Sequence, residues 1–158
     1  MSTYKPAENI EENPRVKAVF DDIRATRNSD FINNMWYYIA FDEDLLERTW
    51  EDVKRVMAQP SHIDPMTKEM IYLAVSIANS CNYCVHSHTA AARAKGMTDE
   101  QYGEVIKIVS LAARTNHIAN GLQIPVDDVF DADKEVKKVE NEDNHYGNNF
   151  FGLLANRG

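Results

Sequence analysis

The chain contains only two cysteines, Cys81 and Cys84, and they stand three residues apart in the stretch "ANSCNYCVHSHTAAARAKG". Residues at this spacing face the same way at the start of a helix, so the two thiols can meet and close a disulfide reversibly. The unsatisfied N–H groups of a first helical turn also stabilise a thiolate and lower the pKa of a cysteine. The pair therefore predicts thiol–disulfide chemistry.

Two ionisable side chains accompany the cysteines. His88 follows Cys84 by four residues, which places its imidazole on the same helical face and lets it exchange protons with either sulfur. Glu69 lies on the preceding helix. If the two helices fold back on each other, Glu69 lies about 15 Å before the turn and His88 about 10 Å after it. We therefore expect a water molecule, rather than a direct contact, to join the carboxylate to the imidazole.

The same four side chains are also of the types that bind zinc. Structural zinc sites usually draw two pairs of ligands from separate segments, whereas three of these residues share one helix. A redox role is favoured, and we expect no metal or cofactor. The alternative is a zinc-binding or assembly module that uses Cys81, Cys84 and His88 without turnover.

The elements that must position these residues are helices, because apolar residues recur at helical spacing along the chain. The fold class is therefore all-α. The stretch "NPRVKAVFDDIRATRN" predicts a helix with Val16, Val19, Phe20 and Ile23 on its inner face. A later helix has Asp42 as its cap, with an expected inner face formed by Leu45, Leu46, Thr49, Val53, Val56 and Met57.

The cysteine pair belongs to a predicted antiparallel helical hairpin. Its first helix has Asp64 as cap and Pro65 at the first helical position, and it breaks at 79–80. Its second helix runs from the cysteine pair to Gly96. A further helix, expected to be the longest, begins with the capping-box pattern Thr98…Gln101 and has an inner face formed by Val105, Ile108, Val109 and Ala112.

Length and charge set the wider limits. A chain of 158 residues fits one domain, 1–158, with a core motif at about 64–101. The formal net charge of −8 would repel phosphate backbones, so we expect no nucleic-acid partner. No apolar run is long enough for a signal peptide or a membrane span. We expect a soluble cytoplasmic protein, in which a close cysteine pair is catalytic or metal-binding rather than structural.

The stretch "DPMTKEMIYLAVSIANSCNYCVHSHTAAARAKGMTDEQ" resembles the core of the alkylhydroperoxidase AhpD-like, or carboxymuconolactone decarboxylase, family. The upstream stretches "PRVKAVFDDIRATRN" and "LLERTWEDVKRVMA" resemble the N-terminal region of its peroxidase-related members. The family pattern is a glutamate, a cysteine twelve residues later, the second cysteine of a CxxC motif, and a histidine four residues after that. Glu69, Cys81, Cys84 and His88 match every interval. Tyr83 departs from the pattern, since well-known members have a histidine there.

The resemblance implies a helical thiol peroxidase that reduces organic hydroperoxides. In such enzymes the residue matching Cys84 attacks the peroxide, and the residue matching Cys81 resolves the sulfenic acid to a disulfide. The residues matching Glu69 and His88 relay protons. Helix-dipole reasoning by itself favours Cys81, nearer the helix end, as the thiol of lower pKa; for the roles we follow the resemblance.

The resemblance also implies what surrounds this site. A dithiol reductant or reductase would recycle the disulfide. The decarboxylases of the family act on a lactone acid and generally lack the CxxC pair, so lyase chemistry is less favoured. Family members form trimers or hexamers, which predicts a homo-oligomer in which the apolar knot Phe150-Phe151-Leu153-Leu154 is covered.

Overall fold

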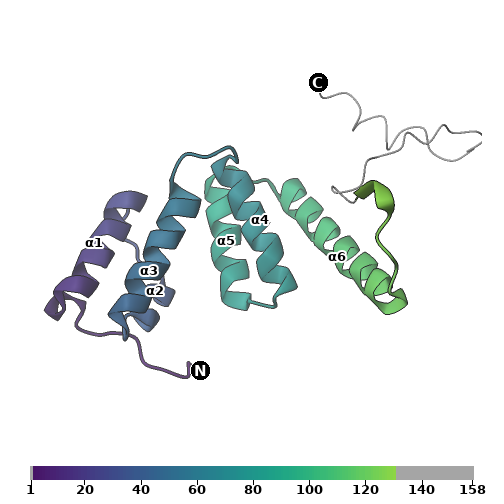
Figure 1. The fold of residues 1–158 in the computed structure, drawn as a ribbon. Helices are drawn as coiled ribbons and strands as arrows, with labels where there is room; N and C mark the ends of the chain where they lie inside the picture. Colours follow the sequence, from purple (N-terminus) through teal and green to yellow (C-terminus); the bar gives the residue numbers. More distant parts are fainter. Residues whose placement is uncertain (1, 131–158) are drawn as a thin grey trace, which may run out of the picture. The chain divides into compact units, whose positions relative to one another are not determined.

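The computed structural model describes residues 2–130, and within that range it contains helices and connecting turns but no strand (Figure 1). The all-α prediction is confirmed. The elements in chain order are η1 (Ile10–Glu12), α1 (Pro14–Arg27), α2 (Asn34–Ile39), α3 (Glu43–Val53), the π-helical turn η2 (Lys54–Ala58), α4 (Pro65–Ala78), α5 (Asn82–Ala94), α6 (Asp99–Leu122) and η3 (Asp128–Phe130).

Contacts divide the chain into two units, Met1–Thr115 and Asn116–Gly158, and the boundary falls inside α6. All four residues of the predicted site belong to the first unit. A single domain over 1–158 stays a prediction, and the apolar knot at 150–154 lies outside the described residues. In the part of the chain that the structure describes, no helix is both long and apolar enough to span a bilayer.

The first three α-helices share one hydrophobic core. The four residues predicted for the inner face of α1 are all buried, which confirms that expectation. They pack with Trp36 of α2 and with Leu46 and Trp50 of α3. The two indole rings meet edge to face with their centroids 5.5 Å apart, a favourable aromatic geometry. This cluster anchors the N-terminal helices.

The inner face predicted for the helix after Asp42 is only partly right. Leu46 is fully buried, but Leu45 is 43% exposed and Val56 is 57% exposed, while Trp50 takes the central place. Leu46 and Trp50 are four residues apart and define the buried stripe, so Leu45 lies about 100° away from it around the helix. Beyond Val53 the backbone becomes π-helical, which shifts the register on which the prediction for Val56 depended.

The predicted helix starts are confirmed by their hydrogen bonds. Asp42 accepts from the Leu45 amide at 2.9 Å, and Asp64 accepts from the Thr67 amide at 3.0 Å. A reciprocal capping box opens α6. There the Thr98 amide donates to Gln101 Oε1 at 2.9 Å, and the Gln101 amide donates to Thr98 Oγ1 at 3.2 Å.

Helices α4 and α5 form the predicted antiparallel hairpin and lie side by side in Figure 1. The chain leaves α5 through Gly96, whose φ of +99° is a conformation that suits glycine. The hairpin therefore has a defined turn at one end and a defined exit at the other.

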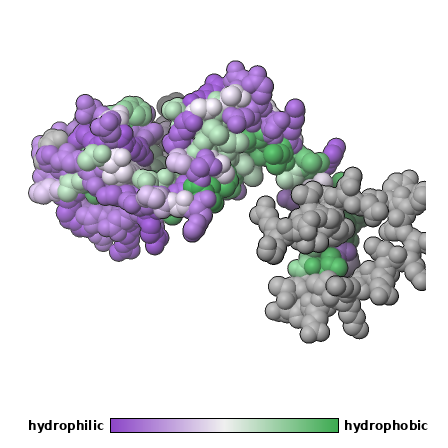
Figure 2. Space-filling view, turned by 90° about the horizontal axis from the view of Figure 1, so that it is seen from above, coloured by the Kyte–Doolittle hydropathy of each residue, from purple (hydrophilic) through white to green (hydrophobic). Residues whose placement is uncertain are grey.

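Apolar side chains also reach the surface. Helix α6, at 24 residues the longest described, buries Val105 but leaves Ile108 65% exposed, so its predicted inner face is mostly wrong. Helix α4 exposes Ile71 and Val75 about half. In Figure 2 the surface over α1–α3 is mainly hydrophilic, whereas hydrophobic residues come to the surface over α4 and α6. The inner face of α6 was predicted wrongly because amphipathic spacing identifies an apolar stripe on a helix but does not show which other element covers that stripe.

The core of α1–α3 yields a stability prediction. Phe20 is fully buried, so Phe20→Ala should lower the free energy of unfolding by about 3–5 kcal/mol in a urea titration. Phe31→Ala is the matched control, because that ring is 69% exposed, and it should change the free energy by about 0.5 kcal/mol or less. Equal losses in the two variants would contradict this core.

Candidate active site

The site begins at the tight turn between α4 and α5. Ser80 adopts a left-handed conformation with φ of +57°. The Ser80 amide donates to the Ile77 carbonyl at 3.1 Å, and the Cys81 amide donates to the Ser76 carbonyl at 2.9 Å. These two bonds form the Schellman pattern that ends a helix and reverses the chain. The predicted break at 79–80 is confirmed, and it leaves Cys81 fixed by the end of α4.

Cys81 also caps the start of α5. Its Sγ accepts a hydrogen bond from the Cys84 amide at 3.3 Å, so Cys81 is the N-cap and the helix itself begins at Asn82. The two cysteines form a disulfide with their Cα atoms 5.3 Å apart, within the ordinary range for such a bridge. The expectation that the thiols can close a disulfide at a helix entrance is therefore matched by the geometry.

Glu69 lies on the buried stripe of α4, in line with Leu73 and Ser76. Its Oε2 is 2.7 Å from Nδ1 of His88 on α5. The expectation of a bridging water was therefore wrong, and the contact is direct. The expectation compared only the positions of the two residues along their helix axes, which differ by about 5 Å. It left out the length of the glutamate and imidazole side chains, and these side chains span that distance.

The second oxygen of the carboxylate has its own partner. Glu69 Oε1 accepts from Nζ of Lys95 at 3.0 Å, and the Glu69 side chain is only 10% exposed. Burial is the largest single influence on its pKa and acts to raise it. The hydrogen bonds from His88 and Lys95 together outweigh burial and hold the pKa of Glu69 below its usual value of 4.5. The buried carboxylate is thus ionised.

Aromatic and cationic side chains border this pair. Tyr72 of α4 stacks on the His88 ring with centroids 3.7 Å apart and planes inclined by 20°. The Arg27 guanidinium lies over the rings of Trp36 and Trp50, 5.7 and 5.5 Å from their centroids, and it interacts electrostatically with Glu69. The N-terminal core thereby presents a positive charge to the site.

Sequence reasoning missed Lys95, Tyr72 and Arg27. Lys95 follows His88 by seven residues, as His88 follows Cys81, so the same two-turn spacing could have found it. Tyr72 is three residues after Glu69 on α4. Arg27 had no usable signal, because its approach to Glu69 depends on how α1 packs in the tertiary structure.

Tyr83, one of the two residues between the cysteines, faces α2 instead of the carboxylate. Its hydroxyl oxygen accepts a hydrogen bond from the Met35 amide at 3.2 Å. It therefore ties the first turn of α5 to the N-terminal helices. A tyrosine here supplies a structural contact across the fold.

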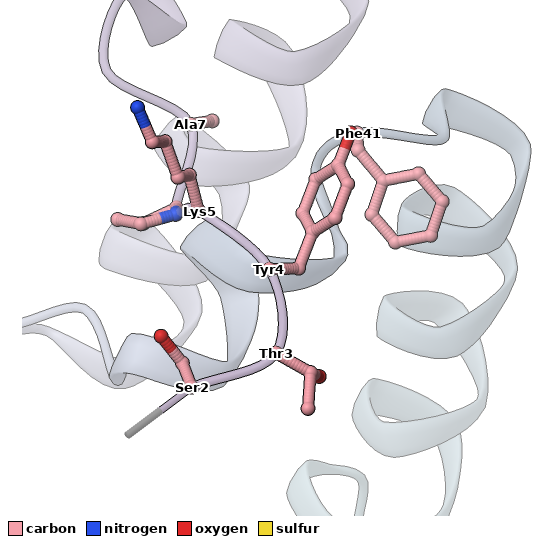
Figure 3. Close-up of a pocket in the computed structure, with 7 residues that line it drawn as sticks. Ser2, Thr3, Tyr4, Lys5, Ala7 and Phe41 are labelled. Atoms are coloured by element: carbon pink, nitrogen blue, oxygen red, sulfur yellow. The ribbon is translucent and has the colours of Figure 1, made fainter.

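The site is neither a metal-ligand cluster of the described residues nor part of the hollow drawn in Figure 3. Among residues 2–130, no three His, Cys, Asp or Glu side chains are arranged to hold a metal ion. A hollow of about 590 Å³ on the described surface is lined by 2–7 and Phe41 and by none of the predicted site residues (Figure 3). What the hairpin offers chemically is a dithiol–disulfide pair beside a hydrogen-bonded carboxylate and imidazole.

Comparison with known proteins agrees with this geometry. The family model described as "Carboxymuconolactone decarboxylase family" matches residues 44–127, more than half of the chain. A crystal structure of the alkylhydroperoxidase AhpD core from Rhodospirillum rubrum is similar with a TM-score of 0.80 and 60% sequence identity, covering 82% of this chain and 97% of that one.

Among the curated relatives that match over shorter segments, two are named alkyl hydroperoxide reductase AhpD. The protein from Corynebacterium kroppenstedtii is 38% identical over 64 residues, which is 40% of this chain and 35% of the relative. The protein from Mycobacteroides abscessus is 41% identical over 51 residues, which is 32% of this chain and 29% of the relative. The matched segments thus span about a third of each curated relative.

The buried carboxylate predicts how stability depends on pH. Because the pKa of Glu69 is lower in the folded protein than its usual 4.5, its ionised form stabilises the fold above that pH. The contribution is lost as the pH falls through the folded-state pKa. Urea titrations between pH 7 and pH 3 should show a smaller acid loss of unfolding free energy for Glu69→Gln than for the wild type.

At pH 7 the same substitution should cost about 1–3 kcal/mol, because it removes charge-assisted bonds to His88 and Lys95. Glu51→Gln, on the exposed surface of α3, is the control and should follow the wild-type curve. An acid loss in Glu69→Gln as large as in the wild type would show that Glu69 is not ionised in the fold.

Proposed function

Because the chain belongs to the carboxymuconolactone decarboxylase family, we propose that it is a thiol-dependent hydroperoxide reductase of that family. The observation that supports this most is the Cys81–Cys84 disulfide on the same hairpin as the Glu69–His88 hydrogen bond. A dithiol that closes reversibly can accept the oxygen of a peroxide, whereas opening or decarboxylating a lactone acid needs no such pair. The names of the two curated relatives and of the similar crystal structure point the same way.

In the proposed first step His88 takes the proton of the Cys84 thiol. The Cys84 thiolate then attacks the terminal oxygen of an organic hydroperoxide, the O–O bond breaks, and the alkoxide leaves. The imidazolium returns its proton to the alkoxide, so the products are an alcohol and a sulfenic acid on Cys84. Glu69 supports the step by holding the ring and stabilising its charged form.

In the second step the Cys81 thiol attacks the sulfenic sulfur. Water leaves and the disulfide forms. An external dithiol then reduces the disulfide by exchange and becomes a disulfide itself. The balance is one hydroperoxide and one dithiol converted to alcohol, water and a disulfide. We place this cycle in the cytoplasm, where reducing thiols are plentiful.

The position of Cys81 suits a sulfur that is displaced as a thiolate when the disulfide is reduced and that forms the disulfide again in the next cycle. Its Sγ accepts a hydrogen bond from the Cys84 amide at the N-terminus of α5. This environment stabilises a thiolate. When the external dithiol attacks Cys84, the displaced Cys81 thiolate is therefore stabilised. The helix-end effect that favours a low pKa at Cys81 is compatible with a resolving role, because a lower pKa makes a better leaving group.

We also propose that the protein is a homo-oligomer, a trimer or a hexamer. Exposed apolar side chains lie on α4 at Ile71 and Val75 and on α6 at Ile108 and Leu111, each 50% exposed or more. Helical faces of this kind are usually covered by a partner. A second copy of the chain is the occupant that the family resemblance favours.

The two sulfurs should respond differently to substitution. Cys84→Ser should abolish the consumption of cumene hydroperoxide, since the attacking thiolate is gone. Cys81→Ser should still consume one equivalent and leave a sulfenic acid on Cys84 that dimedone traps, detected by mass spectrometry. A sulfenic acid trapped on Cys81 in the Cys84→Ser protein, with peroxide consumed, would exchange the roles. Two free thiols remaining in the reduced wild type after peroxide treatment would refute the peroxidase.

Assembly has a separate test. Light scattering should give a mass of three or six times the 18.0 kDa of one chain. Replacing Ile108 by lysine should shift the mass toward one chain, because a buried charge at a subunit contact has no partner. Glu104→Lys, an exposed polar position on the same helix, serves as the control for added charge. A monodisperse monomer in the wild type would contradict the proposal.

A further inference from the structure

We propose that Lys95 is a positioning residue that neutralises the Glu69 carboxylate and so keeps His88 able to accept a proton near neutral pH. The inference deepens the proposed function and rests on it for its role in catalysis. It names a residue that lies outside the Glu–Cys–Cys–His pattern and that acts through Glu69 on His88.

The geometry divides the two carboxylate oxygens between two donors. Oε2 faces Nδ1 of His88 at 2.7 Å, and Oε1 faces Nζ of Lys95 at 3.0 Å. The carboxylate is 10% exposed, the imidazole 21% and the lysine side chain 37%. Glu69 therefore lies between an imidazole and an ammonium group, and its side chain is less exposed to water than either of theirs.

A buried carboxylate with a histidine as its sole partner would bind that histidine's proton strongly. The imidazolium form would gain the full attraction of an unneutralised negative charge in a poorly hydrated place, and the proton affinity of the pair would rise. A larger share of such a histidine would carry a proton near neutral pH, and that share could not act as a base. The ammonium of Lys95 removes this excess attraction while leaving the hydrogen bond that orients the ring.

Two further described groups interact with the pair, Arg27 and Tyr72. Arg27 of α1 adds a second positive influence on Glu69, and it also interacts electrostatically with Tyr83. Tyr72 of α4 covers one face of the His88 ring without adding charge. Lys95 is the cation in direct contact, and its removal is therefore the larger perturbation.

The position of Lys95 is not explained by the helix end alone. It is the C-cap of α5, where a cation interacts favourably with the helix dipole from solvent. Arg93 in the last turn behaves in that way, since its side chain is 52% exposed and pairs with Asp99 at 2.6 Å. The Lys95 ammonium instead contacts the Glu69 carboxylate on the facing helix. A surface charge that only stabilised the helix end would make no such contact.

The test follows the titration of His88 by NMR with histidine labelled at the ring carbon. The disulfide form is used, so that neither cysteine titrates, and His88→Gln assigns the signal. In Lys95→Met the midpoint of the His88 titration should rise by about one pH unit, because a neighbouring charge is lost. Lys95→Gln provides a second neutral variant should Lys95→Met fold poorly.

Two further variants separate charge from packing. Lys95→Arg keeps the cation and should leave the midpoint close to that of the wild type. Lys5→Met makes the same chemical change at an exposed residue of the N-terminal segment and should not move it. An unchanged or lowered midpoint in the neutral variants overturns the inference, and so does a rise in Lys95→Arg equal to that in Lys95→Met.

The catalytic consequence is measured separately. In the Cys81→Ser background, Lys95→Met should slow the oxidation of Cys84 by cumene hydroperoxide up to about tenfold at neutral pH, and the loss should disappear as the pH is raised. The NMR titration needs no peroxide. A protein that consumes no peroxide but shows the shift therefore contradicts the proposed function alone, whereas a peroxidase without the shift contradicts the role of Lys95.

Discussion

The structure of the site depends on one buried negative charge. Glu69 occupies the stripe of α4 that packs on α5, where an unpaired carboxylate would be strongly destabilising. Helix α5 supplies both compensating donors, His88 and Lys95, from positions two turns apart. The pairing of the two helices and the ionisation of the carboxylate therefore stabilise each other, and the orientation of the imidazole follows from both.

The turn that joins these helices connects the fold to the redox chemistry. Cys81 uses its amide to complete the end of α4 and its sulfur to cap the start of α5. The backbone reverses the chain at Ser80, and the first turn of α5 that follows places the two sulfurs within disulfide distance. Tyr83 extends this connection to α2, so the first turn of α5 is held from two sides.

The N-terminal helices contribute more than a stable core. Their two tryptophans lie beneath the Arg27 guanidinium, which acts electrostatically on Glu69 across the boundary between the α1–α3 core and the hairpin. The electrostatic environment of the hairpin site therefore depends also on residues of the N-terminal helices. Stacking of Tyr72 on His88 adds an aromatic cover next to the exposed apolar residues of α4.

The sequence by itself determined the helical class, the buried face of α1 and the helix caps, because each depends on neighbours within a few residues. The spacing of Glu69, Cys81, Cys84 and His88 can be read directly from the chain. Only the tertiary structure decided the direct Glu69–His88 hydrogen bond, the contacts that Arg27 and Tyr83 make, and the exposure of Ile108. These depend on how side chains reach between helices and on which faces other helices cover, and neither quantity is encoded in the periodicity of a single helix.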